Sequence, residues 1–134
     1  MKRKIIGCLT CRPESVYQKR VLDGLMDQCE RYGYDMAVFC PLVDITHYEE
    51  GYLESELNIL NLIQYDRFDA IIVSSLPFVA NGDFPYLNRI CDDIKARCHK
   101  PVVVMDMPMG DFECVVTDDI SAIAEMTRHV INVH

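Results

Sequence analysis

A short polar loop follows the first apolar run of the chain and holds residue types that suit a ligand site. The run is Lys4–Leu9, and the loop after it contains Arg12, Glu14, Ser15 and Tyr17. Tyr17 has an apolar ring with a polar tip, and such a group stacks readily on a sugar or a base. We therefore predict that these four residues contact a small molecule. A second interpretation stays open, in which Tyr17 only anchors the helix that follows.

Two cysteines in the same region, Cys8 and Cys11, have the spacing of a redox pair or of half a zinc site. A thioredoxin-type pair sits at the start of a helix, where the dipole lowers the thiol pKa, but Cys8 falls within the apolar run. A zinc site needs two further ligands, and the four histidines are scattered without a ligand pattern. We expect neither a metal ion nor a cofactor, and a thiol-dependent enzyme is the rival function.

Two adjacent carboxylates, Asp118 and Asp119, are the last chemical candidate. Such a pair can hold a metal ion or act as acid and base. The pair also stands where the final helix should begin, and an aspartate there caps the helix and complements its dipole. A cap does not exclude a hydrogen bond to a ligand, so Asp118 is retained as a candidate.

Five short apolar runs must position these residues. The runs are unbroken rather than alternating, which is typical of strands buried on both faces. Helices are expected between them, over residues 15–31, 48–64 and 85–98 and from 118 or 119 to the end. This pattern predicts an α/β fold with a doubly wound parallel sheet, helices on both faces, and a crevice at the carboxyl ends of the strands. The expected strands are Ile5–Leu9, Met36–Phe39, Asp69–Ser74, Val102–Met105 and Glu113–Thr117.

Several α/β sites are absent from the predicted loops. A dinucleotide site requires three glycines between the first strand and the first helix, and residues 10–15 contain none, which also excludes a P-loop. A phosphorylatable receiver carries an aspartate at the end of its third strand, where this chain has Ser74 and Ser75. We assign no catalytic group and predict that the chain is not an enzyme.

The size and charge of the chain are those of one acidic domain. It has 134 residues, seven cysteines and a formal net charge of −8. This charge argues against direct DNA binding, which uses clustered lysines and arginines to neutralise phosphates. The odd cysteine count, without a recognisable signal peptide, favours free thiols in a reducing cytoplasm. No apolar run approaches the roughly 20 residues that span a bilayer, so no membrane association is expected.

Six short motifs follow one another along nearly the whole chain. They are Lys4–Gly7, Val21–Gly24, Arg31–Tyr34, Phe68–Val73, Lys100–Asp106 and Val115–Asp119, with His129 eleven positions after Asp118. In this order and spacing the chain resembles the effector-binding domain of the lactose-repressor/galactose-repressor (LacI/GalR) family, which is related to periplasmic sugar-binding proteins. The resemblance implies the N-terminal lobe of a periplasmic-binding-protein-like type I fold, with a ligand clamped between this lobe and a second one.

The resemblance also implies which loops face the ligand. They are the loops around Tyr17, Ser74, Ser75, Asp106 and Asp118. It further implies a homodimer, and closure of the two lobes around an effector that changes the behaviour of an attached output module.

Two departures from the family pattern leave alternatives open. The repressors begin with a DNA-binding helix-turn-helix, whereas this chain begins at the first strand, and the final helix is not followed by a sixth strand. We therefore expect residues 1–134 to be one lobe of a longer protein. The prediction is a cytoplasmic lobe that senses a sugar or nucleobase for a LacI-type transcriptional regulator, with DNA bound only through a module outside this chain. The alternatives are the same lobe fused to a diguanylate cyclase, a purely structural dimerisation lobe, and the thiol-dependent enzyme.

Overall fold

A five-stranded parallel sheet forms the centre of the computed structural model, which describes residues 3–41, 55, 58–79 and 85–133. The strand order is β2-β1-β3-β4-β5, so the chain passes outward from β1 to β2 and then returns past β1 to β3. Ligands of open α/β sheets bind where the order reverses in this way, outside the carboxyl ends of the strands. The strands are β1 (Ile5–Leu9), β2 (Asp35–Phe39), β3 (Ala70–Ser74), β4 (Val102–Met105) and β5 (Glu113–Val115).

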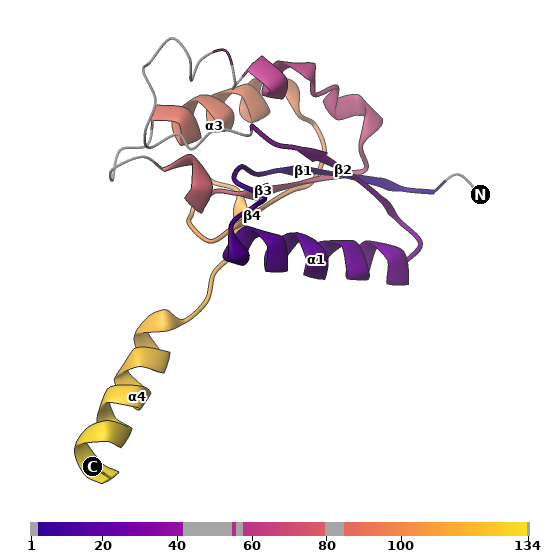
Figure 1. The fold of residues 1–134 in the computed structure, drawn as a ribbon. Coiled ribbons are helices and arrows are strands. Elements are labelled where there is room, and N and C mark those ends of the chain that lie inside the picture. The colour runs from indigo at the N-terminus through magenta and orange to yellow at the C-terminus, as the bar shows by residue number, and fades with distance from the viewer. Residues whose placement is uncertain (1–2, 42–54, 56–57, 80–84, 134) are drawn as a thin grey trace.

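Helices cover both faces of this sheet, which confirms the predicted α/β architecture. Helix α1 (Val16–Arg31) lies against one face and α3 (Pro85–Arg97) lies against the other (Figure 1). The described residues also form three short 3-10 helices: η1 (Asn58–Leu62), η2 (Tyr65–Arg67) and η3 (Leu76–Phe78). Among the residues that the structure describes, no helix has the length and apolar character needed to cross a bilayer.

The larger core lies between the sheet and α3. Val73 of β3 and Val104 of β4 are neighbours in register and are fully buried on this side. Burial of one aliphatic side chain of this size stabilises the fold by about 1.5–3 kcal/mol. The inward face predicted for the third helix is confirmed, since all four of its residues are buried: Leu87, Ile90, Cys91 and Ile94.

The face covered by α1 is less completely buried than the sequence predicts. Ile72 and Val103, whose side chains point to this face, are only half-buried, whereas Ile71, Val73, Val102 and Val104 on the other face are buried. A single described helix covers this face, and one helix is too narrow to shield five strands. The expectation of strands buried on both faces therefore holds for the α3 side and is wrong for this side.

Both ends of α1 form as the sequence predicts. Ser15 is the N-cap, and its Oγ accepts a hydrogen bond from the Gln18 N–H at 3.2 Å. Gly33 adopts a φ of +70°, which ends the helix and lets the Tyr34 N–H donate to the Cys29 carbonyl at 2.7 Å. These two signals fix where α1 begins, and hence where its first turn meets the sheet.

Two predicted elements differ from the structure. The second helix was expected over residues 48–64; residues 48–54 and 56–57 lie outside the described part, Ser55 is α-helical as predicted, and the described end forms the 3-10 helix η1 instead of an α-helix. Leu60 and Ile63 are nevertheless buried, as their spacing predicts. Strand β5 ends at Val115, two residues before the predicted Thr117, because the chain leaves the sheet there toward the last helix.

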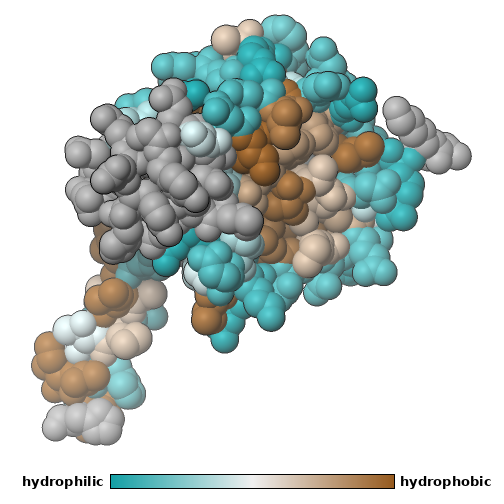
Figure 2. All heavy atoms as spheres, turned by 45° about the horizontal axis from the view of Figure 1, so that its top comes forward, coloured by the Kyte–Doolittle hydropathy of each residue, from teal (hydrophilic) through white to brown (hydrophobic). Residues whose placement is uncertain are grey.

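The last helix, α4 (Asp119–Val133), begins where predicted but extends away from the sheet (Figure 1). None of its described residues is buried. One of its faces is apolar and appears brown on the projecting helix in Figure 2. No described element packs on this stripe, because α4 projects from the sheet whereas α1 and α3 lie on the two sheet faces. The stripe includes Ile120, Ile123, Met126, Val130 and Ile131.

Candidate functional site

Strand register brings two hydroxyl groups together at the carboxyl end of the sheet. Leu9 of β1 pairs with Val73 of β3, so Thr10 and Ser74, the next residue along each strand, are neighbours. Both contact α1 through Gln18: Thr10 Oγ1 and Ser74 Oγ lie 2.9 and 3.2 Å from Gln18 Oε1. All three side chains are buried. The contact joins the first turn of α1 to the sheet edge through polar groups.

Asp106 extends this contact into one continuous network. It follows β4, whose last residue pairs with Ser74. The Ser74 hydroxyl lies 2.8 Å from Asp106 Oδ2, and the Tyr17 hydroxyl donates to Oδ1 at 2.5 Å. Three predicted site residues, Tyr17, Ser74 and Asp106, are thus brought together from three separate parts of the chain. We call the five side chains the edge network: Thr10, Tyr17, Gln18, Ser74 and Asp106.

The phenol of Tyr17 is held in its protonated form by this arrangement. Its hydrogen bond to Asp106 raises the pKa of Tyr17 to about 12, with smaller contributions from partial burial and from the negative charges of Asp106 and Asp119. The side chain is still 51% exposed. About half of the Tyr17 side chain is therefore open to solvent while its hydroxyl is bound.

Two loop residues at this edge have left-handed backbone conformations. Arg12 after β1 has a φ of +56°, and Asp106 after β4 has a φ of +78°. They are the non-glycine residues with positive φ in the described part of the chain. Such conformations cost energy and cluster at ligand sites, where the surrounding structure holds them in place. The carboxyl edge thus carries backbone strain in the loops after β1 and β4.

A cavity of about 200 Å3 opens beside the edge network. It has a polar side, formed by the loop after β1 and the first turn of α1, and an apolar side, formed by residues after β3. Complete ligand pockets usually measure about 300–1,000 Å3, so this hollow has the size of a partial site. Its lining residues are Arg12, Ser15, Tyr17, Gln18, Leu76, Pro77 and Val79.

Arg12, Glu14 and Ser15 occupy the loop at the mouth of this cavity. Arg12 Nε lies 3.8 Å from Glu14 Oε1, and both side chains are partly exposed. Ser15 uses its hydroxyl to cap α1. The ligand contacts predicted for these three residues stay predictions, with Arg12 and Ser15 lining the cavity and Glu14 beside it.

Ser75 has a different environment from its neighbour Ser74. Its hydroxyl oxygen lies 2.7 and 2.8 Å from the carbonyl oxygens of Met105 and Met107, and it accepts from the Met107 N–H at 2.9 Å. The residue is fully buried. Ser75 therefore shapes the turn that carries Asp106, and a direct ligand contact for it stays a prediction.

Asp118 caps α4. Its Oδ1 accepts from the Ser121 N–H at 3.0 Å, and bonds from the Ser121 backbone and side chain lower the pKa of Asp118. Within the described part of the chain Asp118 makes no hydrogen bond to the edge network, whereas the charge of the adjacent Asp119 reaches Tyr17. The first turn of α4 therefore lies close to the site, and ligand contact by Asp118 stays a prediction.

The cysteine pair has none of the features of an activated thiol. Burial, followed by the influence of Cys40 and Cys29, raises the pKa of Cys8 to about 12. The Cys11 thiol is buried and donates to the Pro77 carbonyl at 2.9 Å. Within the described ranges no group of three or more His, Cys, Asp or Glu side chains is placed to hold a metal ion.

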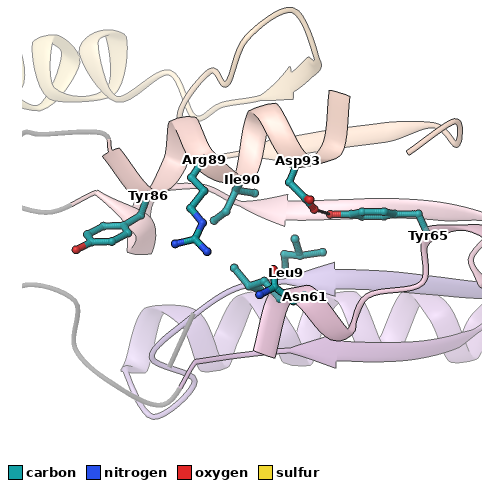
Figure 3. A pocket seen from close by; sticks show the side chains of 8 residues that line it. Leu9, Asn61, Tyr65, Tyr86, Arg89, Ile90 and Asp93 are labelled. Atoms are coloured by element: carbon teal, nitrogen blue, oxygen red, sulfur yellow. Dashed lines mark hydrogen bonds between the residues drawn. The ribbon is translucent and has the colours of Figure 1, made fainter. Parts of the chain in front are cut away.

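A second cavity, of about 250 Å3, lies on the α3 side of the sheet (Figure 3). Asp93 in its wall is already paired, since it accepts from the Tyr65 hydroxyl and from Arg97, each at 2.8 Å. Figure 3 shows the Arg89 side chain between Tyr86 and Asn61. None of the predicted site residues lines this cavity, so it is separate from the edge network.

Sequence reasoning missed Thr10 and Gln18. A signal for Gln18 was present, because it extends the inward stripe of α1 formed by Leu22, Leu25 and Cys29 at helical spacing. A polar residue on a buried stripe needs hydrogen-bond partners, and such a residue marks a polar site. Thr10 carried no signal without knowledge of the register between β1 and β3.

Comparison with known structures finds a shared fold. A crystal structure of the Lac repressor dimer bound to operator and the anti-inducer ONPF superimposes with a TM-score of 0.63 at 11% sequence identity. The match covers 97% of this chain and 35% of the repressor chain. The chain thus has a Lac repressor-like, periplasmic-binding-protein type of α/β fold, and it spans about a third of the length of the protein it matches. No protein-family model and no curated protein sequence matches the chain.

Proposed function

We propose that this chain is the N-terminal lobe of a cytoplasmic small-molecule sensor that regulates transcription in the manner of a LacI-type repressor. The effector, a sugar, a sugar phosphate or a nucleobase, binds at the carboxyl edge of the sheet between this lobe and a second one. DNA is contacted through a module outside residues 1–134, and the protein acts as a homodimer. The Lac repressor-like fold supports this proposal.

The edge network is the observation that carries the proposal. Tyr17, Ser74 and Asp106 come from different loops, and their polar groups meet at the edge where open α/β sheets bind ligands. The exposed ring of Tyr17 and the apolar wall at Leu76 and Pro77 offer surfaces for a sugar or base ring. An effector held there has an aromatic platform, a carboxylate and an amide within reach.

The exposed helix α4 supports a second lobe. Its apolar stripe needs a partner, since burying it would remove side chains such as Ile120 and Ile123 from water at a gain of about 25 cal/mol per Å2. The first turn of α4 lies close to Tyr17. We assign the stripe to packing against the second lobe, which brings that lobe over the cavity.

The rival thiol-dependent enzyme has less support. A nucleophilic cysteine requires a lowered pKa, and the pKa of Cys8 is raised. Cys11 is buried and directs its thiol to a backbone carbonyl. Tyr17 is accessible at the site and suits ligand binding, whereas the thiols of Cys8 and Cys11 are buried and cannot reach a substrate there.

Calorimetric titration of the full-length protein tests the proposal. Free sugars, sugar phosphates and nucleobases are titrated in turn, and one of these classes is expected to bind. Replacement of Asp106 by Asn should weaken that binding by about tenfold or more, because a charged hydrogen-bond acceptor is lost.

Asp111→Asn is the matched control, since Asp111 is an exposed aspartate that pairs with Lys95 away from the edge network. Equal affinities of the two variants would contradict the site. Absence of binding by any of the three ligand classes, with the protein folded by circular dichroism, would reject the function.

A further inference from the structure

The number of hydrogens available in the edge network decides how its groups are oriented. A serine hydroxyl has one hydrogen, and Ser74 Oγ lies 2.8 Å from Asp106 Oδ2 and 3.2 Å from the Gln18 amide. A carboxylate only accepts, and a hydrogen bond to a charged group is the stronger one. The Ser74 hydrogen therefore belongs to the bond with Asp106.

This assignment fixes the orientation of the Gln18 amide. Once Ser74 has donated to Asp106, its oxygen can only accept, so the amide group that faces it must be the NH2. The nitrogen and oxygen of a glutamine amide are nearly equivalent in shape, and the hydrogen-bond network decides between them. The NH2 carries a second hydrogen for Thr10, which lies 2.9 Å away and whose own hydroxyl reaches the Cys11 carbonyl at 3.4 Å.

The Gln18 carbonyl oxygen is then the atom left to face the cavity that Gln18 helps to line. Gln18 is only 3% exposed, so this oxygen has little access to water. Asp106, whose two oxygens receive Tyr17 and Ser74, adds a carboxylate to the same edge. The positive charge of Arg12 at the mouth is matched by Glu14 in the same loop. Gln18 and Asp106 therefore place two hydrogen-bond acceptors at this edge, and the donor Arg12 lies at the mouth beside Glu14.

We infer that Gln18 is a specificity-determining residue of the lobe. Its carbonyl oxygen, together with the Asp106 carboxylate, selects an effector that donates hydrogen bonds and carries no negative charge, such as a neutral monosaccharide, over a sugar phosphate. A phosphate would bring negative charge toward the Asp106 carboxylate and the Gln18 carbonyl oxygen, and like charges repel there, while the charge of Arg12 is already matched by Glu14. This inference rests on the proposed function, because it chooses among the effector classes for the same site.

Nuclear magnetic resonance tests the orientation without any ligand. Side-chain amide hydrogens of Gln18 that donate to buried Ser74 and Thr10 should exchange slowly with solvent in the wild-type protein. Exchange should become faster in the Ser74→Ala variant, which removes one of the two acceptors. Fast exchange that is the same in both proteins would place the NH2 toward the cavity and overturn the inference.

Calorimetry on the full-length protein tests the selectivity. Glucose, galactose and ribose are compared with their phosphate esters, and the preferred neutral sugar should bind about tenfold or more tightly than its phosphate. Gln18→Met should reduce the affinity for that sugar by about tenfold, whereas Gln28→Met, a control at an exposed position of the same helix, should not.

The possible outcomes distinguish a failure of the Gln18 inference from a failure of the proposed sensing function. Tighter binding of a sugar phosphate would overturn the role of Gln18 and leave the sensing function in place. Tight binding of an uncharged nucleobase would support the selectivity if Gln18→Met weakened it about tenfold, and would overturn the role of Gln18 if that variant bound it equally well. A folded protein that binds none of these compounds would overturn the proposed function itself.

Discussion

Tyr17 and Asp106 are 89 positions apart in the chain, yet the hydroxyl of the first donates to the carboxylate of the second. One belongs to the first turn of α1 and the other to the loop after β4. The bond crosses the crevice end of the sheet above β3. It therefore links α1 to the loop after β4, both of which the proposed effector would contact.

Loss of this bond should have a small effect on stability. Tyr17→Phe removes the hydroxyl but keeps the ring, and we expect the free energy of unfolding to fall by about 0.5–1 kcal/mol, because the side chain is half-exposed. Urea denaturation measures the change. Tyr32→Phe is the matched control, since Tyr32 lies exposed at the other end of α1. A loss of several kcal/mol would mean that Tyr17 is part of the core.

The same tyrosine should ionise late. Its folded-state pKa of about 12 lies above the ordinary value of 10, so its contribution to stability is complete below pH 10 and is lost as the pH rises through about 12. Ultraviolet titration of tyrosinate should show a late-ionising group that Asp106→Asn shifts toward pH 10. A titration curve identical in the two proteins would contradict the bond.

Gly7 of β1 should not tolerate a methyl group. A Cβ at this position would lie 2.8 Å from Ile71 Cδ1 and 3.2 Å from the Phe68 ring, both within the core. We expect Gly7→Ala to destabilise the protein by about 1–3 kcal/mol in urea denaturation.

Gly24→Ala is the control for this substitution. A Cβ on Gly24 meets no atom within 4 Å, and the residue lies inside α1, so alanine there should stabilise the helix by about 0.5–1 kcal/mol. A Gly7→Ala protein that is as stable as the wild type, or more stable, would contradict the close packing around Gly7.

Cys8 should be inert in the folded protein. With a pKa of about 12 it holds almost no thiolate at pH 8, and its side chain is buried. Iodoacetamide at pH 8 followed by mass spectrometry should leave Cys8 unmodified until urea unfolds the chain. Rapid alkylation of Cys8 in the native protein would revive the thiol-dependent enzyme.

Asp118 should control the first turn of α4. Asp118→Ala removes the acceptor for the Ser121 N–H, and amide chemical shifts of residues 119–122 should move toward coil values. Asp118→Asn should keep them helical, because asparagine caps as well as aspartate does. If both variants lost the helical shifts, the negative charge rather than the cap would hold this turn.

The strands, α1 and α3 were predictable because local signals coincide with them. Ser15 and Gly33 mark the ends of α1, and the spacing of Ile90 and Ile94 marks the buried face of α3. The position of α4 was not predictable in this way. Its amphipathic pattern shows that it needs a partner, but periodicity does not say where the partner lies.

The candidate site was predictable in part. The loop after the first strand drew attention to Tyr17, and the family resemblance added Ser74 and Asp106, which the structure places together. Thr10 and Gln18 were missed because their roles depend on the register of β1 against β3 and on which turn of α1 meets that edge. The pattern of a single sequence segment does not reveal which residues of distant segments become neighbours.

The bond between Tyr17 and Asp106 also means that a side chain of the protein itself occupies the position where an effector hydroxyl would bond to Asp106. A phenol occupies one carboxylate oxygen and the Ser74 hydroxyl occupies the other. An effector hydroxyl that takes the place of the phenol exchanges one hydrogen bond for another, so its affinity reflects a difference between two similar partners. Displacement of the phenol from Asp106 would free the Tyr17 side chain, so effector binding would move this one aromatic ring.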